Sequence, residues 1–278
     1  MSLENQAVCS AVINQVPVTN TVSSPLLIGD SMHIFNQQVH RALITQDSTA
    51  LGNLVQRQLA TGVQALAVNL GPGKAMGRLT PWVVNTIREI TDMQLFFSAN
   101  ILTQKQILQT HGQGITINAV TANRDDLDRA FDIAQEYGNS LVVLLVQAGK
   151  VTAGIEDRLQ IASEVLDQAM VKNFPLSRLY LDPVLSSRPD PVAWHVSRGL
   201  PDVGSAVETI ALIKQLDGRV KTIVALANGS EGMVREKRSG FHGQILALFT
   251  EAGIDAVLLN CLDSKMMRIS EGIQSGMA

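Results

Sequence analysis

A carboxylate stands where one apolar run of this sequence ends, and a proline follows it at once. Asp182 closes the run Leu179-Tyr180-Leu181 and precedes Pro183-Val184. If the run is a strand of a parallel α/β barrel, the residue at its carboxyl end faces the mouth where such barrels bind ligands. The proline removes a backbone donor and restricts the turn. Asp182 is therefore either a ligand-binding carboxylate or an ordinary Asp-Pro turn, and the residue type alone does not choose.

Polar side chains also end the other apolar runs. The full set is Asp30, Ser31, Asn69, Ser98, Asn118, Gln147, Asp182, Asn228, Ser230 and Asn260. Because the carboxyl ends of barrel strands converge on one cavity, a ring of amides around a carboxylate suits a flat, neutral, hydrogen-bonding heterocycle better than a phosphate or a metal. A single Asn is more readily a turn or cap residue, so the set, rather than any member, predicts a binding site.

The sequence does not indicate a metal site or the active site of a serine hydrolase. The histidines His33, His40, His111, His195 and His242 include no pair at i and i+4, so we expect no bound metal. The segment Gly229-Ser230-Glu231-Gly232 does not have the GxSxG spacing of a serine hydrolase elbow.

The elements that must position the polar residues are short apolar runs alternating with helical patterns. Eight strands are predicted, at 25–29, 65–69, 94–98, 114–118, 140–145, 179–182, 222–227 and 256–260. Helices are predicted between them, for example over 125–137 and 157–171, where apolar residues recur at helical spacing. The early GxGxxG turn of a doubly wound sheet is missing, so we predict a (β/α)8 barrel over 25–278, preceded by an N-terminal extension over 1–24.

The amino-acid composition indicates which kinds of binding partner to expect. The 278 residues carry a net charge of −3, and 17% of them are charged, which predicts neither nucleic-acid nor membrane binding. The two cysteines, Cys9 and Cys261, lie far apart and suggest a reducing, cytoplasmic setting.

Five short motifs in register along the chain resemble one family. They are Leu27-Ile28-Gly29, Val68-Asn69-Leu70-Gly71-Pro72, Ile117-Asn118, Leu179-Tyr180-Leu181-Asp182-Pro183 and Leu226-Ala227-Asn228-Gly229-Ser230. Over roughly residues 25 to 270 the sequence is similar to the pterin-binding, dihydropteroate synthase-like TIM barrels. Among these it is closest to the methyltetrahydrofolate:corrinoid protein methyltransferases.

The resemblance implies roles for particular residues. Asp182 and Asn118 would hold the 2-amino-4-oxo edge of a pterin, and Asn228 would bind near N5 as the catalytic residue. The remaining candidates for pterin binding are Ser98, Asn69, Asp30, Gln147 and Ser230.

The sequence also departs from the family pattern. Asp30-Ser31-Met32-His33 replaces a Glu-Arg-Ile-Asn sequence, Val68 stands at or next to the place of one acid, and Ser98 replaces another. The losses put the binding pose of the pterin in doubt, together with any proton path to N5 through those acids.

The implied reaction moves a methyl group between N5 of tetrahydrofolate and the cobalt of a corrinoid. Tetrahydrofolate or 5-methyltetrahydrofolate would be the substrate, a separate corrinoid protein the partner, and a homodimer the expected assembly. Two alternatives remain, a non-catalytic folate-binding subunit and a dihydropteroate synthase-type enzyme. The second is the weaker, because that family uses a lysine after the seventh strand and Arg-x-His at the eighth, where this chain has Asn228-Gly229 and Asn260-Cys261.

Overall fold

The computed structural model describes residues 24–71, 74–112, 114–148, 154–185, 203–230 and 232–276. Apart from Ser24, the predicted N-terminal extension lies outside these ranges.

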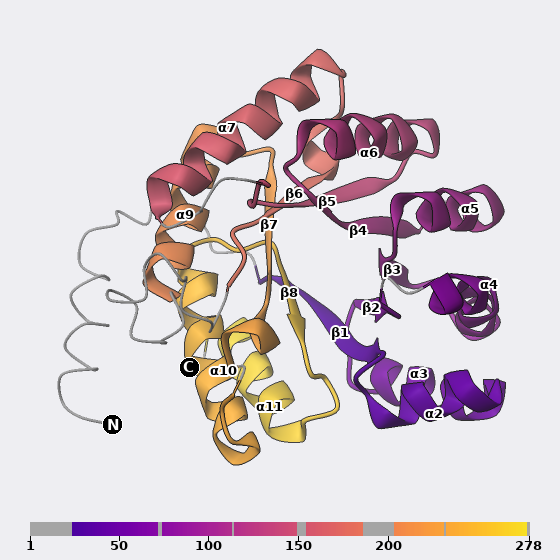
Figure 1. Cartoon of the computed structure of the whole chain (residues 1–278). Coiled ribbons are helices and arrows are strands. Elements are labelled where there is room, and N and C mark those ends of the chain that lie inside the picture. Colours follow the sequence, from indigo (N-terminus) through magenta and orange to yellow (C-terminus); the bar gives the residue numbers. More distant parts are fainter. Residues whose placement is uncertain are drawn as a thin grey trace.

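Eight parallel strands form one closed barrel in sequence order, with β1 paired to both β2 and β8 (Figure 1). The strands are β1 (Leu26–His33), β2 (Ala65–Asn69), β3 (Gln94–Ser98), β4 (Ile115–Thr121), β5 (Ser140–Leu144), β6 (Leu179–Asp182), β7 (Lys221–Ala225) and β8 (Ala256–Leu259). Each predicted strand is therefore found, and the predicted (β/α)8 barrel is confirmed.

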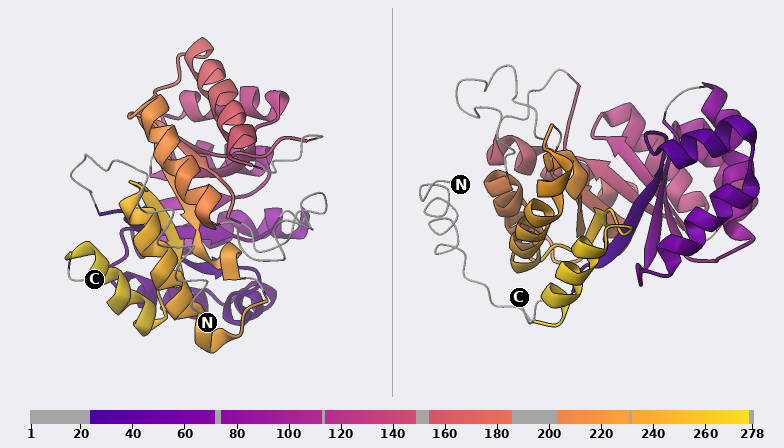
Figure 2. Two further views of the ribbon diagram at one scale, coloured as in Figure 1. Left: turned by 90° about the vertical axis from the view of Figure 1, so that its left-hand side faces the viewer. Right: turned by 90° about the horizontal axis from the view of Figure 1, so that it is seen from below.

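The α-helices form an outer layer around the strands, as two further views also show (Figure 2). They are α2 (Gln37–Thr45), α3 (Ser48–Leu59), α4 (Lys74–Arg88), α5 (Ile101–His111), α6 (Arg124–Glu136), α7 (Ile155–Val171), α9 (Val203–Leu216), α10 (Arg235–Glu251) and α11 (Ser264–Gln274). Two 3-10 turns are also present. The turn η1 (Leu176–Arg178) directly precedes β6, and η2 (Leu226–Ser230) directly follows β7. Within the described residues, no helix is both long and apolar enough to cross a membrane.

The strands are apolar on both faces because each face meets a different core. Ile28, Phe96, Val142, Tyr180 and Ile223 belong to a small cluster that fills the barrel interior. The intervening residues face the helices and join a much larger cluster. This double burial explains why the strands read as almost continuous apolar runs in the sequence.

Helices α10 and α11 pack closely at one glycine. A Cβ added at Gly243 of α10 would lie 2.8 Å from Ile269 Cγ2 of α11, whereas one at Gly240, a turn earlier, would meet nothing within 4 Å. The absence of a side chain at residue 243 thus lets the two helices approach.

This pair of glycines gives a matched test of the packing. We expect Gly240→Ala to raise the free energy of unfolding by about 0.5–1 kcal/mol through helix propensity and the loss of unfolded-state freedom. Gly243→Ala has the same stabilising effect but forces Ile269 to move, so we expect the free energy of unfolding to fall by about 1–2 kcal/mol in total. Urea denaturation of both variants measures the difference. Equal stabilisation by the two substitutions would contradict the close approach.

Candidate functional site

In several strands, the last residue that points into the barrel is polar and lies at the mouth. Tyr180 and Phe96 point into the interior. Because alternate residues of a strand share a face, Asp182 and Ser98, two residues later, also point inward. Asn69 follows interior Ala67 in the same way. Val68, by contrast, is fully buried in the outer core, so Ala67 holds the inward position that precedes Asn69.

Bulges place two further candidates. Pairing of β1 with β2 steps from Gly29↔Leu66 to Met32↔Val68, which leaves one extra residue at Asp30-Ser31. β4 has the same irregularity at Asn118-Ala119. The sequence predicted these residues at strand ends, but both strands continue three residues further, to His33 and Thr121. A bulge of this kind reorients side chains at a barrel rim.

A buried glutamine supports the bulge in β1. The bulge removes the Ser31 N–H from the sheet, and this group donates to Gln58 Oε1 of α3 at 3.1 Å. Gln58 is completely buried, so its acceptor satisfies a backbone donor that would otherwise be lost inside the protein. Gln58 is not among the residues predicted from the sequence. Its signal was a polar residue on the apolar stripe of Leu51, Leu54 and Val55.

Residues of three neighbouring strands form an arc along the mouth. Asn69 on β2 is in register with Ser98 on β3, and Asn118 Nδ2 of β4 donates to Ser98 Oγ at 3.4 Å. The Asn69 side chain also accepts from the Gly71 N–H at 3.0 Å, which closes the turn after β2. Asn69 therefore has a local structural role, and Asn118 and Ser98 form the polar pair of this arc.

Asp182 holds the turn that follows β6. Its Oδ1 accepts from the Val184 N–H at 2.7 Å, so this oxygen holds the turn. No hydrogen bond from the described residues reaches Oδ2. Burial raises the pKa of Asp182 to about 7, although the Val184 N–H and the charge of Arg158 act in the opposite direction.

Asp30, on β1, is a second carboxyl group at the mouth whose pKa is raised. Desolvation raises its pKa to about 6, opposed by a hydrogen bond from its own backbone. Two mouth residues, Asp30 and Asp182, thus hold protons at a pH at which ordinary carboxyl groups are ionised. Perturbed carboxyl groups of this kind are common at functional sites.

The residues after β5 and β7 divide into exposed and buried groups. Asn228 is exposed on η2, and its side chain makes no hydrogen bond within the described residues. Ser230 is 2% exposed and lies 2.8 Å from His242 Nε2, so the structure places it beneath the mouth rather than in it. Gln147 donates to the Ala122 carbonyl at 3.4 Å, and its buried Oε1 has no partner in the described part of the chain.

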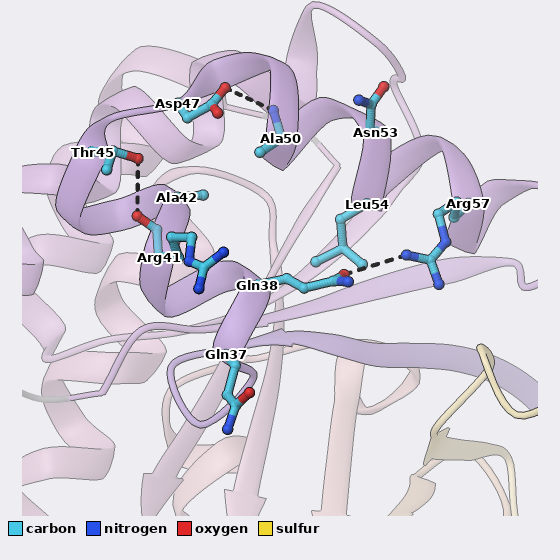
Figure 3. Close-up of a pocket in the computed structure, with 10 residues that line it drawn as sticks. All are labelled: Gln37, Gln38, Arg41, Ala42, Thr45, Asp47, Ala50, Asn53, Leu54 and Arg57. Atoms are coloured by element: carbon cyan, nitrogen blue, oxygen red, sulfur yellow. Dashed lines mark hydrogen bonds between the residues drawn. The ribbon is translucent and has the colours of Figure 1, made fainter.

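A separate hollow of about 780 Å³ opens between α2 and α3 (Figure 3). Arg57 Nη1 donates there to Gln38 Oε1 at 3.3 Å, and Asp47 caps α3 by accepting from the Ala50 N–H at 2.9 Å. No polar strand-end residue lines this hollow. Its polar groups mainly serve the two helices, and the convergent donors and acceptors are those of the mouth.

The described residues of the mouth offer hydrogen-bonding groups. No group of three His, Cys, Asp or Glu side chains that could hold a metal occurs in the ranges that the structure describes. The available groups are one carboxylate oxygen of Asp182, the Asn118–Ser98 pair, the Asp30 carboxyl group and the amide of Asn228. This combination can bind a planar heterocycle by its N–H and carbonyl edge.

Comparison with known proteins agrees with the fold. No family model matches the chain. Dihydropteroate synthase from Xanthomonas albilineans with 4-aminobenzoic acid is 16% identical with a TM-score of 0.65, covering 93% of this chain and 95% of that one. The Yersinia pestis enzyme with a pterine-sulfa conjugate has 11% identity, a TM-score of 0.62 and coverages of 94% and 96%. The Coxiella burnetii enzyme with pteroic acid has 13% identity, a TM-score of 0.60 and coverages of 92% and 94%.

The protein therefore shares its (β/α)8 barrel fold with these dihydropteroate synthases. The match extends over nearly the whole of both chains, so the complete barrel is shared rather than a part of it.

The raised pKa of Asp182 predicts how stability varies with pH. The folded protein binds this proton more tightly than the unfolded chain does, so ionisation above pH 3.8 progressively destabilises the fold until the pH passes about 7. Asp182→Asn keeps an acceptor for the Val184 N–H and removes the ionisation. We expect it to raise the free energy of unfolding at pH 8 by about 2–4 kcal/mol, with a difference that shrinks toward pH 4.

Asp217 provides a control of opposite sign. Hydrogen bonds from Arg219 hold the pKa of Asp217 below its usual value, so Asp217→Asn should slightly destabilise the protein at pH 8. Urea denaturation between pH 4 and pH 8 tests both variants. A pH-independent effect of Asp182→Asn would show that the carboxyl group is not held protonated by burial.

Proposed function

We propose that this protein transfers a methyl group between N5 of tetrahydrofolate and the cobalt of a corrinoid carried by a separate protein. The observation that carries the proposal is the state of Asn228. This amide follows β7 at the barrel mouth, is exposed, and is not used in any hydrogen bond within the described residues. A neutral amide in this place suits chemistry at a ring nitrogen better than chemistry at a pyrophosphate.

The pterin edge would be held on the other side of the mouth. Asp182 Oδ2 can accept from the 2-amino group and the adjacent ring N–H, which stabilises the ionised carboxylate. Asn118 can donate to O4 or accept from a ring N–H, and Ser98 Oγ, within 3.4 Å of Asn118 Nδ2, fixes the orientation of that amide. These contacts would be shielded from water by the barrel, so they give orientation as well as affinity.

Asn228 would act at N5 by hydrogen bonding. A methyl group on N5 leaves slowly because the nitrogen must accept negative charge, so a donor placed at N5 lowers the barrier. Asp30, whose pKa burial raises to about 6, could pass a proton toward N5 at the same mouth. The corrinoid, when its carrier docks, supplies the cobalt that exchanges the methyl group.

Dihydropteroate synthase is the alternative that the shared fold supports equally well. The residues of this chain favour it less. In β7 the lysine is Lys221, at the first position of the strand, where its Nζ donates to the Tyr180 hydroxyl at 3.4 Å. This places the lysine at the opposite end of the barrel from Asn228. The non-catalytic folate-binding subunit requires the same pterin contacts and differs by the absence of turnover.

Three measurements distinguish these functions. Calorimetry with tetrahydrofolate and 5-methyltetrahydrofolate tests binding, a cob(I)alamin assay tests methyl transfer, and condensation of 4-aminobenzoic acid with a pterin pyrophosphate tests synthase activity. The proposal expects binding and methyl transfer. Failure to bind either folate would overturn it, binding without turnover would favour the non-catalytic subunit, and condensation would favour the synthase.

Substitutions at the mouth should separate binding from catalysis. We expect Asp182→Ala to weaken folate binding by roughly 100-fold or more, because a charge-assisted pair of hydrogen bonds is lost. Asn228→Ala should lower the methyl-transfer rate by roughly 100-fold and change the folate Kd by less than about threefold, as expected for a donor used in the transition state. Calorimetry and single-turnover kinetics measure the two quantities.

Asn53→Ala is the matched control, because Asn53 is an exposed amide at the α2–α3 hollow. It should change neither quantity. Normal methyl transfer by Asn228→Ala would remove the role given to Asn228.

A further inference from the structure

A buried hydrogen bond connects α10 to the turn that carries Asn228. His242 Nε2 lies 2.8 Å from Ser230 Oγ, and the two residues are 7% and 2% exposed. Ser230 Oγ also donates to the Ala227 carbonyl at 3.2 Å, which closes η2 on itself. Since the hydroxyl proton is used in that bond, Ser230 Oγ accepts from His242, and the network assigns the proton to Nε2.

The charged groups around His242 do not make this pair a nucleophile and base. Burial lowers the pKa of His242, Arg238 lowers it further, and Asp263 raises it, so the ring is neutral near pH 7. Asp263 Oδ2 accepts from Ser239 Oγ at 2.5 Å, and its Oδ1 accepts from the backbone N–H groups of Lys265 and Met266 in α11. With Asp263 engaged elsewhere and Ser230 buried, the His242–Ser230 bond serves structure rather than attack on a substrate.

A second contact holds the same turn from the side of Asp182. A Cβ added at Gly229 would lie 2.7 Å from Leu185 Cδ2 and 3.5 Å from Phe241 Cε1. Leu185 follows the Asp182 turn by three residues, and Phe241 precedes His242 on α10. The turn η2 is therefore enclosed between the segment after β6 and helix α10.

The enclosure leaves one polar side chain of η2 outside. Leu226, Gly229 and Ser230 are buried, whereas Asn228 is exposed. The backbone on both sides of Asn228 is thus fixed by contacts below the mouth, and its amide is presented above it. A donor that extends from a fixed backbone needs less reorganisation to reach its position in a transition state.

We propose that His242 is a positioning residue that fixes the backbone from which the Asn228 side chain extends, through its hydrogen bond to Ser230. The inference rests on the catalytic role proposed for Asn228 and adds a residue that does not touch the substrate. Loss of the bond leaves the Ser230 hydroxyl without its donor and lets η2 change shape.

The test compares His242→Phe, which removes the donor, with His242→Gln, whose amide can again donate to Ser230. We expect His242→Phe to lower the methyl-transfer rate by roughly 10- to 100-fold with a nearly unchanged folate Kd, and His242→Gln to restore much of the rate. In an Asn228→Ala background, His242→Phe should have no further effect on the rate. A general structural defect would instead reduce both backgrounds equally, and that result would overturn the proposal.

Thr250→Val is the matched control on the same helix. It removes a hydrogen bond from Thr250 Oγ1 to the Leu246 carbonyl that stays within α10, so the rate should not change.

A measurement that does not need turnover keeps this inference separate from the proposed function. Amide hydrogen exchange at 226–230 should be slow in the natural protein, much faster in His242→Phe and slow again in His242→Gln. If the protein shows this pattern but transfers no methyl group, the proposed function fails and the positioning of Asn228 stands. Unchanged exchange in His242→Phe would refute the positioning role whatever the activity.

Discussion

The pairing of the first strand with the last is the interaction without which this site would not exist. Hydrogen bonds between β1 and β8 close the sheet, so Asp30 on β1 and Asn260 beyond β8 become neighbours although they are distant in sequence. Ser31 Oγ and Asn260 Oδ1 lie 3.4 Å apart across this closure. Closure also gives every strand an inward face, and therefore a common mouth at which the polar ends of the strands meet.

The sequence was sufficient to predict the architecture because the architecture depends on local patterns. Double burial makes each strand an apolar run, and helical spacing marks helices such as α6, where Leu127, Ala130, Phe131 and Ala134 are buried as the predicted stripe requires. The same patterns located Asp182 and Ser98 at strand ends. They did not reveal the bulges at Asp30-Ser31 and Asn118-Ala119, because a bulge is a property of the pairing between two strands and not of either strand alone.

The residues that support the site could not be predicted from the sequence for a related reason. Gln58 acts on β1 from α3, 27 residues away, and Leu185 meets Gly229 across two different loops. Ser230 was expected to bind the ligand because it stands in the same motif as Asn228. Its hydroxyl is directed to Ala227 and His242 instead. The motif did not reveal the 3-10 turn, whose rotation of about 120° per residue separates the directions of Asn228 and Ser230.

The half-protonated state of Asp182 has a thermodynamic consequence for ligand capture. A ligand that donates two N–H groups to this carboxyl favours its ionised form, so near pH 7 each binding event releases part of a proton to the solvent. The observed enthalpy of binding would then contain the ionisation enthalpy of whatever buffer takes up that proton. A ligand bound in this way would couple occupancy of the mouth to proton concentration through one carboxyl group, without any change in the shape of the barrel.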